Sequence, residues 1–344
     1  MRYKGVYKND PYYEVQGVGV YLGSKCNQDC LYCRDKAFRK HPEVTKDSVS
    51  ILLKFLDTLK GLRGITLVGG EPFLYTDYLK YFYDYADDRK LTIHFITNSL
   101  GLQEDNIWDT FIKDKENIHI QVSYDGSNNS RGYAILDNKK VRERCSTLIA
   151  ENRFSVCSVI TKDSWNVVSI FSDFLNSFGN VSFNWMISPL LESAGCKELN
   201  KETPVADFLY SFYQFLNTYK WSGLARYVLL KYLRSMDYHI GKEELFLEMD
   251  GSIVRSCFDY TPIGRWDNEG TTKVFNKSNY LSLNSSSPNC SGCIINELCI
   301  KRPEFFSPTS CQMRVGMEEC IFSIIRESGC STLEEFEGML HGLQ

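Results

Sequence analysis

The sequence has no long apolar run and no strong excess of charge of one sign. No apolar stretch approaches the roughly 20 residues that span a bilayer. The N-terminal residues are polar and aromatic, without the apolar segment of a secretory signal. The formal net charge is -4 and the isoelectric point is about 5.8, which gives no field to attract polyanions. These features argue against a membrane protein and against nucleic acid as a partner, and they predict a location in the cytoplasm.

Internal repeats and low-complexity segments are also missing. Hydrophobic residues make up 43% of the chain and charged residues 24%, an ordinary composition for a globular protein. The length of 344 residues fits one large domain with a smaller one and allows a sizeable core.

Cysteine, by contrast, is abundant, with thirteen residues. Disulfides are rare in cytosolic chains, where grouped cysteines usually bind metal or perform redox chemistry. Cys145 and Cys157 lie in apolar patterns and are predicted to be buried. Three others gather within residues 26–33 and seven within residues 257–330. The grouping predicts two metal-bearing regions.

The first cysteine group has the spacing Cys26-x3-Cys30-x2-Cys33. Four-iron clusters normally take four Cys ligands, so three thiolates on one short loop indicate a cluster with one iron open to something other than protein. A structural zinc site, completed by a distant Cys or by His41, is the alternative interpretation of this spacing.

Short apolar runs alternate with helical patterns from about residue 15 to 190, which predicts βα units around a parallel sheet. Six runs are predicted strands: Val15–Leu22, Ile65–Val68, Leu91–Thr97, Ile118–Ser123, Phe154–Ile160 and Val181–Ile187. Parallel α/β folds keep their chemistry at the carboxyl ends of the strands. The cysteine loop directly follows the first run and is expected at that end.

Helices are predicted between these strands from the apolar spacing. The clearest covers Val49 to Leu59, with Asp47 or Ser48 as its N-cap and Gly61 as its terminator. Further helical patterns cover residues 77–88, 105–115, 135–150, 167–178 and 203–238. Residues 245–254 are predicted to form a β-hairpin that turns on Asp250-Gly251, after a domain boundary near residue 240.

Three segments place polar groups where predicted strands end: Gly69-Gly70-Glu71-Pro72, Thr97-Asn98-Ser99 and Ser123-Tyr124-Asp125-Gly126. Two successive glycines let the backbone approach a ligand closely, and proline fixes the turn. By default Asn98 and Asp125 would be turn formers that bond their own backbone. At this end of the sheet, polar side chains can also bond a ribose or a carboxylate.

The cysteine spacing, with Tyr32 between the second and third cysteines and Gly69-Gly70-Glu71-Pro72 downstream, resembles the radical S-adenosylmethionine (SAM) enzymes. The resemblance implies an α/β fold, a partial (β/α)6 TIM barrel. In it, Cys26, Cys30 and Cys33 would hold a 4Fe-4S cluster whose open iron is chelated by SAM. It also implies reductive cleavage of SAM to a 5′-deoxyadenosyl radical that abstracts hydrogen from a substrate. A zinc site would need neither Tyr32 nor the glycine segment.

The same resemblance implies which residues bind SAM. The segment from Gly69 to Pro72 would hold the amino group of SAM. Arg131 would pair with its carboxylate as a bidentate donor, although a solvated surface arginine is an equal alternative. The ribose or carboxylate would be bonded by the strand-end residues Asn98, Ser123 and Asp125. The last two belong to a segment that resembles the Ser-x-Asp-Gly of peptide-modifying family members.

In the last quarter, Cys290-x2-Cys293-x5-Cys299 resembles the central signature of the SPASM extension, which carries auxiliary iron-sulfur clusters in peptide-modifying members of the family. Cys320 is the expected fourth ligand, because it lies near the family spacing and opens an apolar helical run. Cys311 is the nearer competitor for that role.

The SPASM pattern is incomplete. The cysteine expected after Gly264 is absent, and Arg302 stands at another position where a cysteine is usual. The resemblance therefore implies one auxiliary 4Fe-4S cluster, or an unusual second one that Cys257 joins. A zinc ribbon suits these CxxC pairs equally well, and only the upstream motifs favour iron and sulfur.

Together these resemblances cover nearly the whole chain and imply a radical SAM core over residues 1–240 and a SPASM-like iron-sulfur domain over 241–344. The implied substrate is a ribosomally made peptide, changed by crosslinking, thioether formation, epimerisation or oxidation, with flavodoxin or ferredoxin as electron donor. Cys196 is a candidate hydrogen-atom donor to the substrate radical, and Asp125 a candidate catalytic residue. Two alternatives stay open: a radical SAM dehydrogenase acting on a small molecule such as a sugar, and a non-catalytic zinc-binding protein.

Overall fold

The computed structural model describes residues 15–33, 41–127, 129, 131, 135–189, 202–220, 222–229, 244–256, 259–266, 308–330 and 333–341. At its centre is a sheet in the order β6-β5-β4-β3-β2-β1-β7-β8-β9. Strands β1 to β6 pair in parallel, which confirms the predicted α/β arrangement. Their bounds are Gly17–Tyr21, Gly64–Val68, Thr92–Thr97, Ile118–Ser123, Phe154–Ile160 and Asn184–Pro189.

Three later strands continue the same sheet beyond β1. Strand β7 (Glu244–Glu248) pairs in parallel with β1, and β8 (Ser252–Ser256) and β9 (Asp259–Arg265) follow antiparallel. The predicted turn at Asp250-Gly251 joins β7 to β8, with Gly251 at a φ of +88°. Strands β7 to β9 are therefore hydrogen-bonded into the same sheet as β1 to β6, and the division of the chain into two domains near residue 240 stays a prediction.

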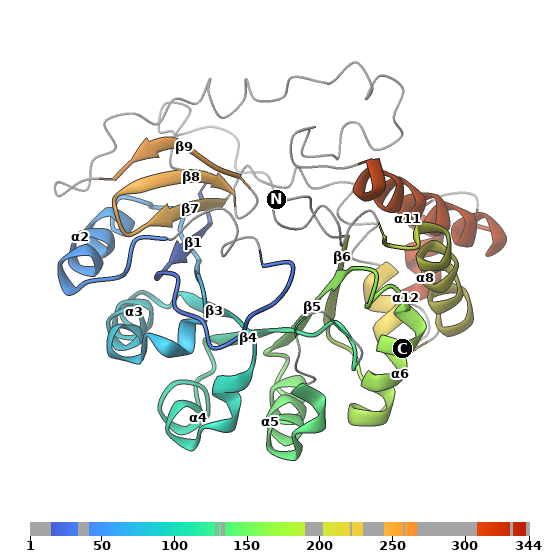
Figure 1. Ribbon diagram of the computed structural model, residues 1–344, viewed down its shortest axis with the longest axis horizontal. Coiled ribbons are helices and arrows are strands. Elements are labelled where there is room, and N and C mark those ends of the chain that lie inside the picture. Colours follow the sequence, from blue (N-terminus) through green and yellow to red (C-terminus); the bar gives the residue numbers. More distant parts are fainter. Residues whose placement is uncertain are drawn as a thin grey trace.

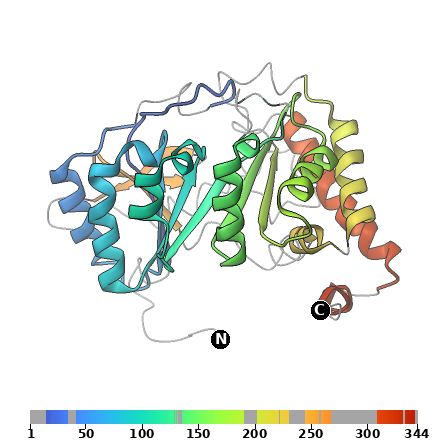
Figure 2. The same ribbon diagram turned by 90° about the horizontal axis from the view of Figure 1, so that it is seen from below.

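Helices cover the outer side of the curved sheet (Figures 1 and 2). They are α2 (Lys46–Leu56), α3 (Thr76–Arg89), α4 (Asp105–Phe111), α5 (Lys139–Ala150) and α6 (Val167–Phe178). Beyond β6 lie α8 (Val205–Tyr219), α11 (Pro308–Glu327), which packs on α8, and α12 (Leu333–His341). Among the described residues, no helix has the length and apolar character needed to cross a membrane.

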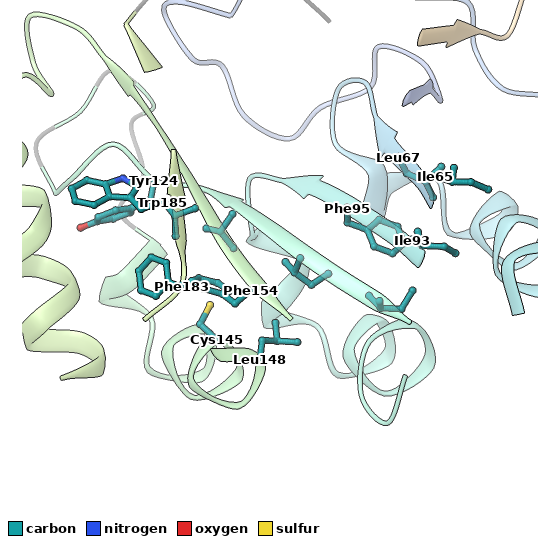
Figure 3. Packing of buried hydrophobic residues seen from close by; sticks show 14 of the residues in the cluster. Ile65, Leu67, Ile93, Phe95, Tyr124, Cys145, Leu148, Phe154, Phe183 and Trp185 are labelled. Atoms are coloured by element: carbon teal, nitrogen blue, oxygen red, sulfur yellow. The ribbon is translucent and has the colours of Figure 1, made fainter. Parts of the chain in front are cut away.

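The hydrophobic core lies between the outer face of the sheet and the helices. Burial alternates along β3 and β4, where every second side chain is enclosed and the others are partly exposed. Figure 3 shows Ile65, Leu67, Ile93 and Phe95 gathered at one part of this core, and Trp185, Phe183 and Phe154 with Cys145 and Leu148 of α5 at another. The predicted burial of Cys145 is confirmed, whereas Cys157 is only partly buried.

The partly exposed side chains of the strands face the inside of the arch and are largely polar. His94 of β3 and His119 of β4 lie side by side, with ring centroids 5.1 Å apart, and His119 Nε2 is 3.1 Å from Ser155 Oγ of β5. Burial lowers the pKa of His119 to about 4, so this ring is neutral at pH 7. Burial also lowers the pKa of His94, so these two rings are polar groups whose positive charge is disfavoured.

Several predicted boundaries were wrong. The N-cap of α2 is Thr45, not Asp47 or Ser48, because the Thr45 hydroxyl accepts from the Ser48 N–H while the Ser48 side chain bonds back to the Thr45 N–H. This helix ends at Leu56, before Gly61. Helix α11 begins at Pro308, where proline suits a first helical position, so Cys320 lies well inside it.

Strand β6 begins at Asn184, three residues later than predicted. The preceding Phe183 packs instead into an aromatic group under the sheet, with ring centroids 5.3 Å from Phe174 and 5.2 Å from Phe154. The apolar side chains of Val181 and Phe183 therefore reflect core packing before the strand starts.

Candidate functional site

The cysteine loop leaves β1 and is held at its start by side chains from two other segments. The Lys25 N–H donates to the Tyr75 hydroxyl (2.8 Å), and the Ser24 N–H donates to Glu43 Oε1 (3.0 Å). Tyr75 in turn donates to Glu43 Oε2 (3.1 Å). Since Tyr75 follows η1 (Pro72–Leu74) and Glu43 precedes α2, the loop is fixed from both sides.

The glycine segment after β2 packs directly against this loop. A Cβ atom on Gly70 would lie 1.9 Å from the Lys25 carbonyl oxygen, and one on Gly69 would lie 2.8 Å from the Gly23 oxygen. Both glycines have positive φ, +96° at Gly69 and +45° at Gly70. The Glu71 N–H also donates to the Lys25 carbonyl (2.8 Å). The glycines therefore allow close contact between two pieces of backbone, where sequence reasoning expected close contact with a ligand.

Glu71 is fully buried and connects the ends of β2 and β3. Its carboxylate accepts hydrogen bonds from Phe73 N–H (3.3 Å), Thr97 Oγ1 (2.7 Å) and Asn98 N–H (2.8 Å). Burial raises the pKa of Glu71 to about 7, although these three hydrogen bonds act to lower it. Pro72 begins the short helix η1 and is buried.

Of the three cysteines of the loop, Cys26 is exposed, and Cys30 and Cys33 are half-buried. Two donors lie near their sulfur atoms: Asn98 Nδ2 is 3.8 Å from Cys26 Sγ, and Arg131 Nη1 is 4.0 Å from Cys30 Sγ. Hydrogen bonds and charge at thiolate sulfur are what iron-sulfur sites use to set their properties. Three thiols on one pinned loop, with such donors beside them, fit a cluster with three protein ligands.

The zinc interpretation required His41 or another group to join these thiols. His41 instead stacks on Tyr21, with ring centroids 4.3 Å apart, and its Nδ1 is 3.7 Å from Glu248 Oε1. Within the described residues, no three His, Cys, Asp or Glu side chains converge to hold a single metal ion.

Asp125, two residues after the end of β4, joins the cysteine loop to two other segments. Its Oδ2 accepts from the Tyr32 hydroxyl and from Arg131 Nε (2.7 Å), while its Oδ1 accepts from the Val159 N–H (2.8 Å). The guanidinium carbon of Arg131 lies 5.2 Å from the centroid of the Tyr32 ring. Arg131, which could have been a solvated surface residue, is 11% exposed in its side chain and forms an ion pair with the enclosed Asp125.

These neighbours act on the ionisation of Cys30 and Tyr32. Burial raises the pKa of the Cys30 thiol, and the positive charge of Arg131 opposes that rise. The pKa of Tyr32 is raised well above its usual value, first by burial and also by Asp125. Burial disfavours the charge of Arg131, but Asp125 and its neighbours hold the pKa of this guanidinium above its ordinary value.

The structure brings most of the predicted SAM residues to the carboxyl ends of neighbouring strands. Asn98 is buried at the end of β3, where its Nδ2 donates to Asn27 Oδ1 (2.7 Å) and its Oδ1 accepts from the Leu100 N–H (3.0 Å), as a turn former does. Ser123 ends β4 and is partly exposed. Sequence reasoning missed Tyr75 and Glu43, and for Thr97 it missed the bond to Glu71, because the partners lie far away in the chain.

The second cysteine group is described only in part. Cys196, Cys257, Cys290, Cys293 and Cys299 lie outside the described residues. Cys311 and Cys320 are both on α11, nine positions apart and therefore on opposite faces of the helix. Cys311 is exposed, whereas Cys320 is half-buried against α8, where its thiol donates to the Leu209 carbonyl (3.7 Å).

Three comparisons with known proteins bear on this site. The family model of the radical SAM superfamily matches residues 20–167, which include the cysteine loop, the glycine segment and Asp125. A curated relative, a probable GTP 3′,8-cyclase of Methanocaldococcus jannaschii, is 27% identical over 92 residues. That match covers 26% of this chain and only 30% of the cyclase.

Solved structures match more of the chain at lower identity. Native anSMEcpe with bound AdoMet and Cp18Cys peptide aligns with a TM-score of 0.65 and 17% identity, over 91% of this chain and 99% of that one. SuiB of Streptococcus suis bound to its precursor peptide SuiA aligns with a TM-score of 0.59 and 16% identity, over 87% of this chain and 76% of SuiB. At these identities the likeness concerns the fold.

Proposed function

We propose that this chain, whose residues 20–167 match the radical SAM family model, is a radical SAM enzyme that modifies a ribosomally made peptide. The family implies a 4Fe-4S cluster and SAM, which when bound supply a 5′-deoxyadenosyl radical able to abstract an unactivated hydrogen. The protein then has to hold these groups, orient the peptide and exclude water.

Cys26, Cys30 and Cys33 are the proposed ligands of the cluster. The loop that carries them is fixed to Tyr75 and Glu43 before the first cysteine, so its start is set by folding. The observation that carries this part of the proposal is the contact between Gly70 and the Lys25 carbonyl, because it brings the cysteine loop and the glycine segment together. In this arrangement a ligand of the open iron would also meet the Gly69–Pro72 backbone.

We assign the remaining contacts with SAM to residues at the carboxyl ends of the strands. We assign the amino group of SAM to the Gly69–Pro72 segment and its ribose to Asn98 and Ser123. Asn98 is already held by the Glu71 carboxylate through its backbone N–H (2.8 Å), which fixes its position before SAM binds. Asp125 uses both carboxylate oxygens in contacts with the chain, which suits a connecting role better than proton transfer.

The peptide part of the proposal is supported by the fold. The two matched structures were solved with peptides, and their likeness extends over about nine-tenths of this chain, including segments beyond the radical SAM domain. The inner side of the arch offers half-exposed polar groups, such as Gln121 and the neutral His119, both on β4. Groups of this kind can hydrogen-bond peptide amides without demanding a charged substrate.

For the second metal region we propose one auxiliary four-iron cluster on Cys290, Cys293, Cys299 and Cys320. Of the two candidates on α11, Cys320 is the one shielded by α8, and iron-sulfur clusters depend on such shielding. We propose a flavodoxin- or ferredoxin-type protein as the electron donor, which places the enzyme in the reducing cytoplasm.

The peptide proposal is tested by co-expressing the protein with each short reading frame that flanks its gene, followed by mass spectrometry of the peptides. Crosslinking or oxidation removes hydrogens, and epimerisation in D2O adds deuterium, so each expected product changes the mass. Such a change should vanish with the Cys26, Cys30 and Cys33 triple alanine variant. Substrate-dependent SAM cleavage with sugars but with none of these peptides would contradict the proposal and favour the small-molecule dehydrogenase.

A further inference from the structure

We propose that Arg131 is a fixed positive charge that raises the electron affinity of the metal site on Cys30, and that Asp125 and Tyr32 are positioning residues that hold it there. The inference rests on the proposed function, because it requires a cluster on the cysteine loop. It gives Arg131 a different task from the one implied by sequence resemblance, which was to bind the carboxylate of SAM.

Geometry places this charge beside the thiol. Arg131 Nη1 is 4.0 Å from Cys30 Sγ, whereas its Nε is 2.7 Å from Asp125 Oδ2. The guanidinium also lies over the ring of Tyr32, with its carbon 5.2 Å from the ring centroid. Tyr32 is two residues after Cys30, so Arg131 contacts the cysteine loop both at the ligand and at the aromatic residue next to it.

The charge is held from several directions. Asp125 is itself fixed by the Val159 N–H of β5 (2.8 Å) and by the Tyr32 hydroxyl. The backbone N–H of Arg131 donates to Asn129 Oδ1 (2.8 Å). The side chains of Arg131 and Asp125 are 11% and 0% exposed, so solvent screens the pair only weakly. A guanidinium restrained in this way cannot turn away from Cys30 without breaking these contacts.

Stability alone does not account for such a pair. Buried ion pairs give little net stability, because the loss of hydration of both charges offsets their attraction, and apolar side chains of similar size often serve as well. Arginine also stays charged at any physiological pH. A permanent cation beside a metal-ligand thiolate has a definite electrostatic effect: it favours whichever state of the site carries more negative charge.

That effect has a sign that can be measured. One electron from a flavodoxin- or ferredoxin-type donor makes the site more negative, with no bond made or broken, so Arg131 should favour the reduced state and Asp125 should oppose it. Removing the two charges singly should therefore move the reduction equilibrium in opposite directions. If Arg131 and Asp125 served only to hold the loop, changing either of them would instead affect the site in the same direction.

The experiment is a dithionite redox titration of the full chain, reconstituted without oxygen and without SAM, followed by the electron paramagnetic resonance signal of the reduced Cys26-loop cluster. For Arg131→Met we expect the reduction equilibrium constant to fall about tenfold, which is about 59 mV for one electron. Asp125→Asn keeps an oxygen that accepts from Arg131 Nε and so leaves the guanidinium in place while removing the negative charge, and for it we expect a rise of the same order. Arg131→Lys keeps the charge and should stay within about threefold of the unchanged protein.

Arg144→Met is the matched control. Arg144 is also enclosed, with 9% of its side chain exposed, pairs with Asp105 and lies over an aromatic ring, with its guanidinium carbon 5.1 Å from the centroid of Trp108. Its side chain donates to the Leu102 carbonyl (2.6 Å), the Glu104 carbonyl and Asp105, and among the described residues it has no hydrogen bond to Cys26, Cys30 or Cys33. This variant should lose stability in the same way as Arg131→Met but keep the equilibrium constant of the unchanged protein.

Each possible outcome decides the proposal. Shifts of the same sign in Arg131→Met and Asp125→Asn, or no shift in Arg131→Met, would overturn it, as would equal loss of iron from Arg131→Met and Arg131→Lys. If Asp125→Asn does not assemble the site, the comparison of Met with Lys at position 131 carries the test. Weaker SAM binding in Arg131→Met with an unchanged titration would return this residue to the SAM carboxylate. Failure of the unchanged protein to form the cluster would overturn the proposed function itself.

Discussion

The carboxylate of Glu71 and the backbone N–H of Asn98 are joined by a hydrogen bond of 2.8 Å, which ties the end of β2 to the end of β3. The Glu71 N–H donates to the Lys25 carbonyl at the same distance, at the start of the cysteine loop after β1. One buried residue thus connects three neighbouring strand ends. The proposed SAM contacts at these ends depend on it.

Glu71 should make the stability of the protein depend on pH. Its pKa is about 7 when folded against an ordinary value of 4.5, so the folded chain holds this proton over a range where the unfolded chain has lost it. The free energy of unfolding should therefore fall between pH about 4.5 and about 7, by on the order of 3 kcal/mol. Urea unfolding of the reconstituted protein at pH 5.5 and pH 8 measures this fall.

Glu71→Gln provides the comparison, because it removes the titrating group and nearly keeps its shape. The difference in unfolding free energy between the two proteins should change with pH, since other groups titrate equally in both. A constant difference across this range would show that Glu71 is not the group responsible.

Gly70→Ala should disrupt the proposed SAM site. The added Cβ would lie 1.9 Å from the Lys25 carbonyl oxygen, so the cysteine loop or the glycine segment has to move. We expect iron content to fall and SAM affinity, measured by equilibrium dialysis, to weaken at least tenfold. Gly329→Ala is the control, because Gly329 also has a positive φ, +77°, but nothing lies within 4 Å of its added Cβ.

Strain at a positive φ alone costs an alanine about 1 kcal/mol at either position. The two glycine variants should therefore lose comparable stability from this source, while only Gly70→Ala loses SAM binding. Equal SAM affinity in both would mean that contact with the loop is not required.

Changing Cys26, Cys30 and Cys33 together to alanine should abolish SAM cleavage and remove the iron of the first cluster while leaving the iron of the second. Asn98 and Arg131 lie near these thiols as hydrogen-bond donors to sulfur. They cannot replace the three thiolates as ligands of iron. Iron analysis and chromatography of 5′-deoxyadenosine measure both effects. Cys330→Ser changes a thiol between α11 and α12 and should leave both unaffected. Retained cleavage in the triple variant would contradict the assignment.

Changing Cys290 and Cys293 to alanine should instead remove the iron of the second cluster and spare SAM cleavage. Iron content should fall by about half, since one of two four-iron clusters is lost, but slow formation of 5′-deoxyadenosine without substrate should persist. Unfolding of the C-terminal region on metal loss is checked by circular dichroism. Unchanged iron, with zinc present, would show that the second region is a zinc site.

The parallel sheet could be predicted because its strands are buried on one face and flanked by amphipathic helices. The predicted bounds Ile118–Ser123 and Phe154–Ile160 agree with β4 and β5. Thr45 was missed as an N-cap because its partner is Ser48, whereas the usual signature of a capping box has Glu or Gln there. Strand β6 was misplaced because an apolar run does not distinguish core packing from strand pairing.

The site was predictable only where its residues are close in sequence. The cysteine spacing and the glycine segment are local patterns, so they could be recognised. Tyr32 and Asp125 are 93 positions apart, and no local pattern predicts that the hydroxyl of one bonds the carboxylate of the other. The position of Arg131 follows from that pair, which explains why sequence alone left it equally a SAM ligand or a surface residue.

The central claim is that the cysteine loop holds a cluster that cleaves SAM. It is tested most directly by measuring iron, zinc and 5′-deoxyadenosine in the full chain, purified and reconstituted without oxygen, with SAM and a reductant. The account predicts about eight irons per chain, from two four-iron clusters, and release of 5′-deoxyadenosine that requires the reductant. Zinc in place of iron, with no release, would contradict it.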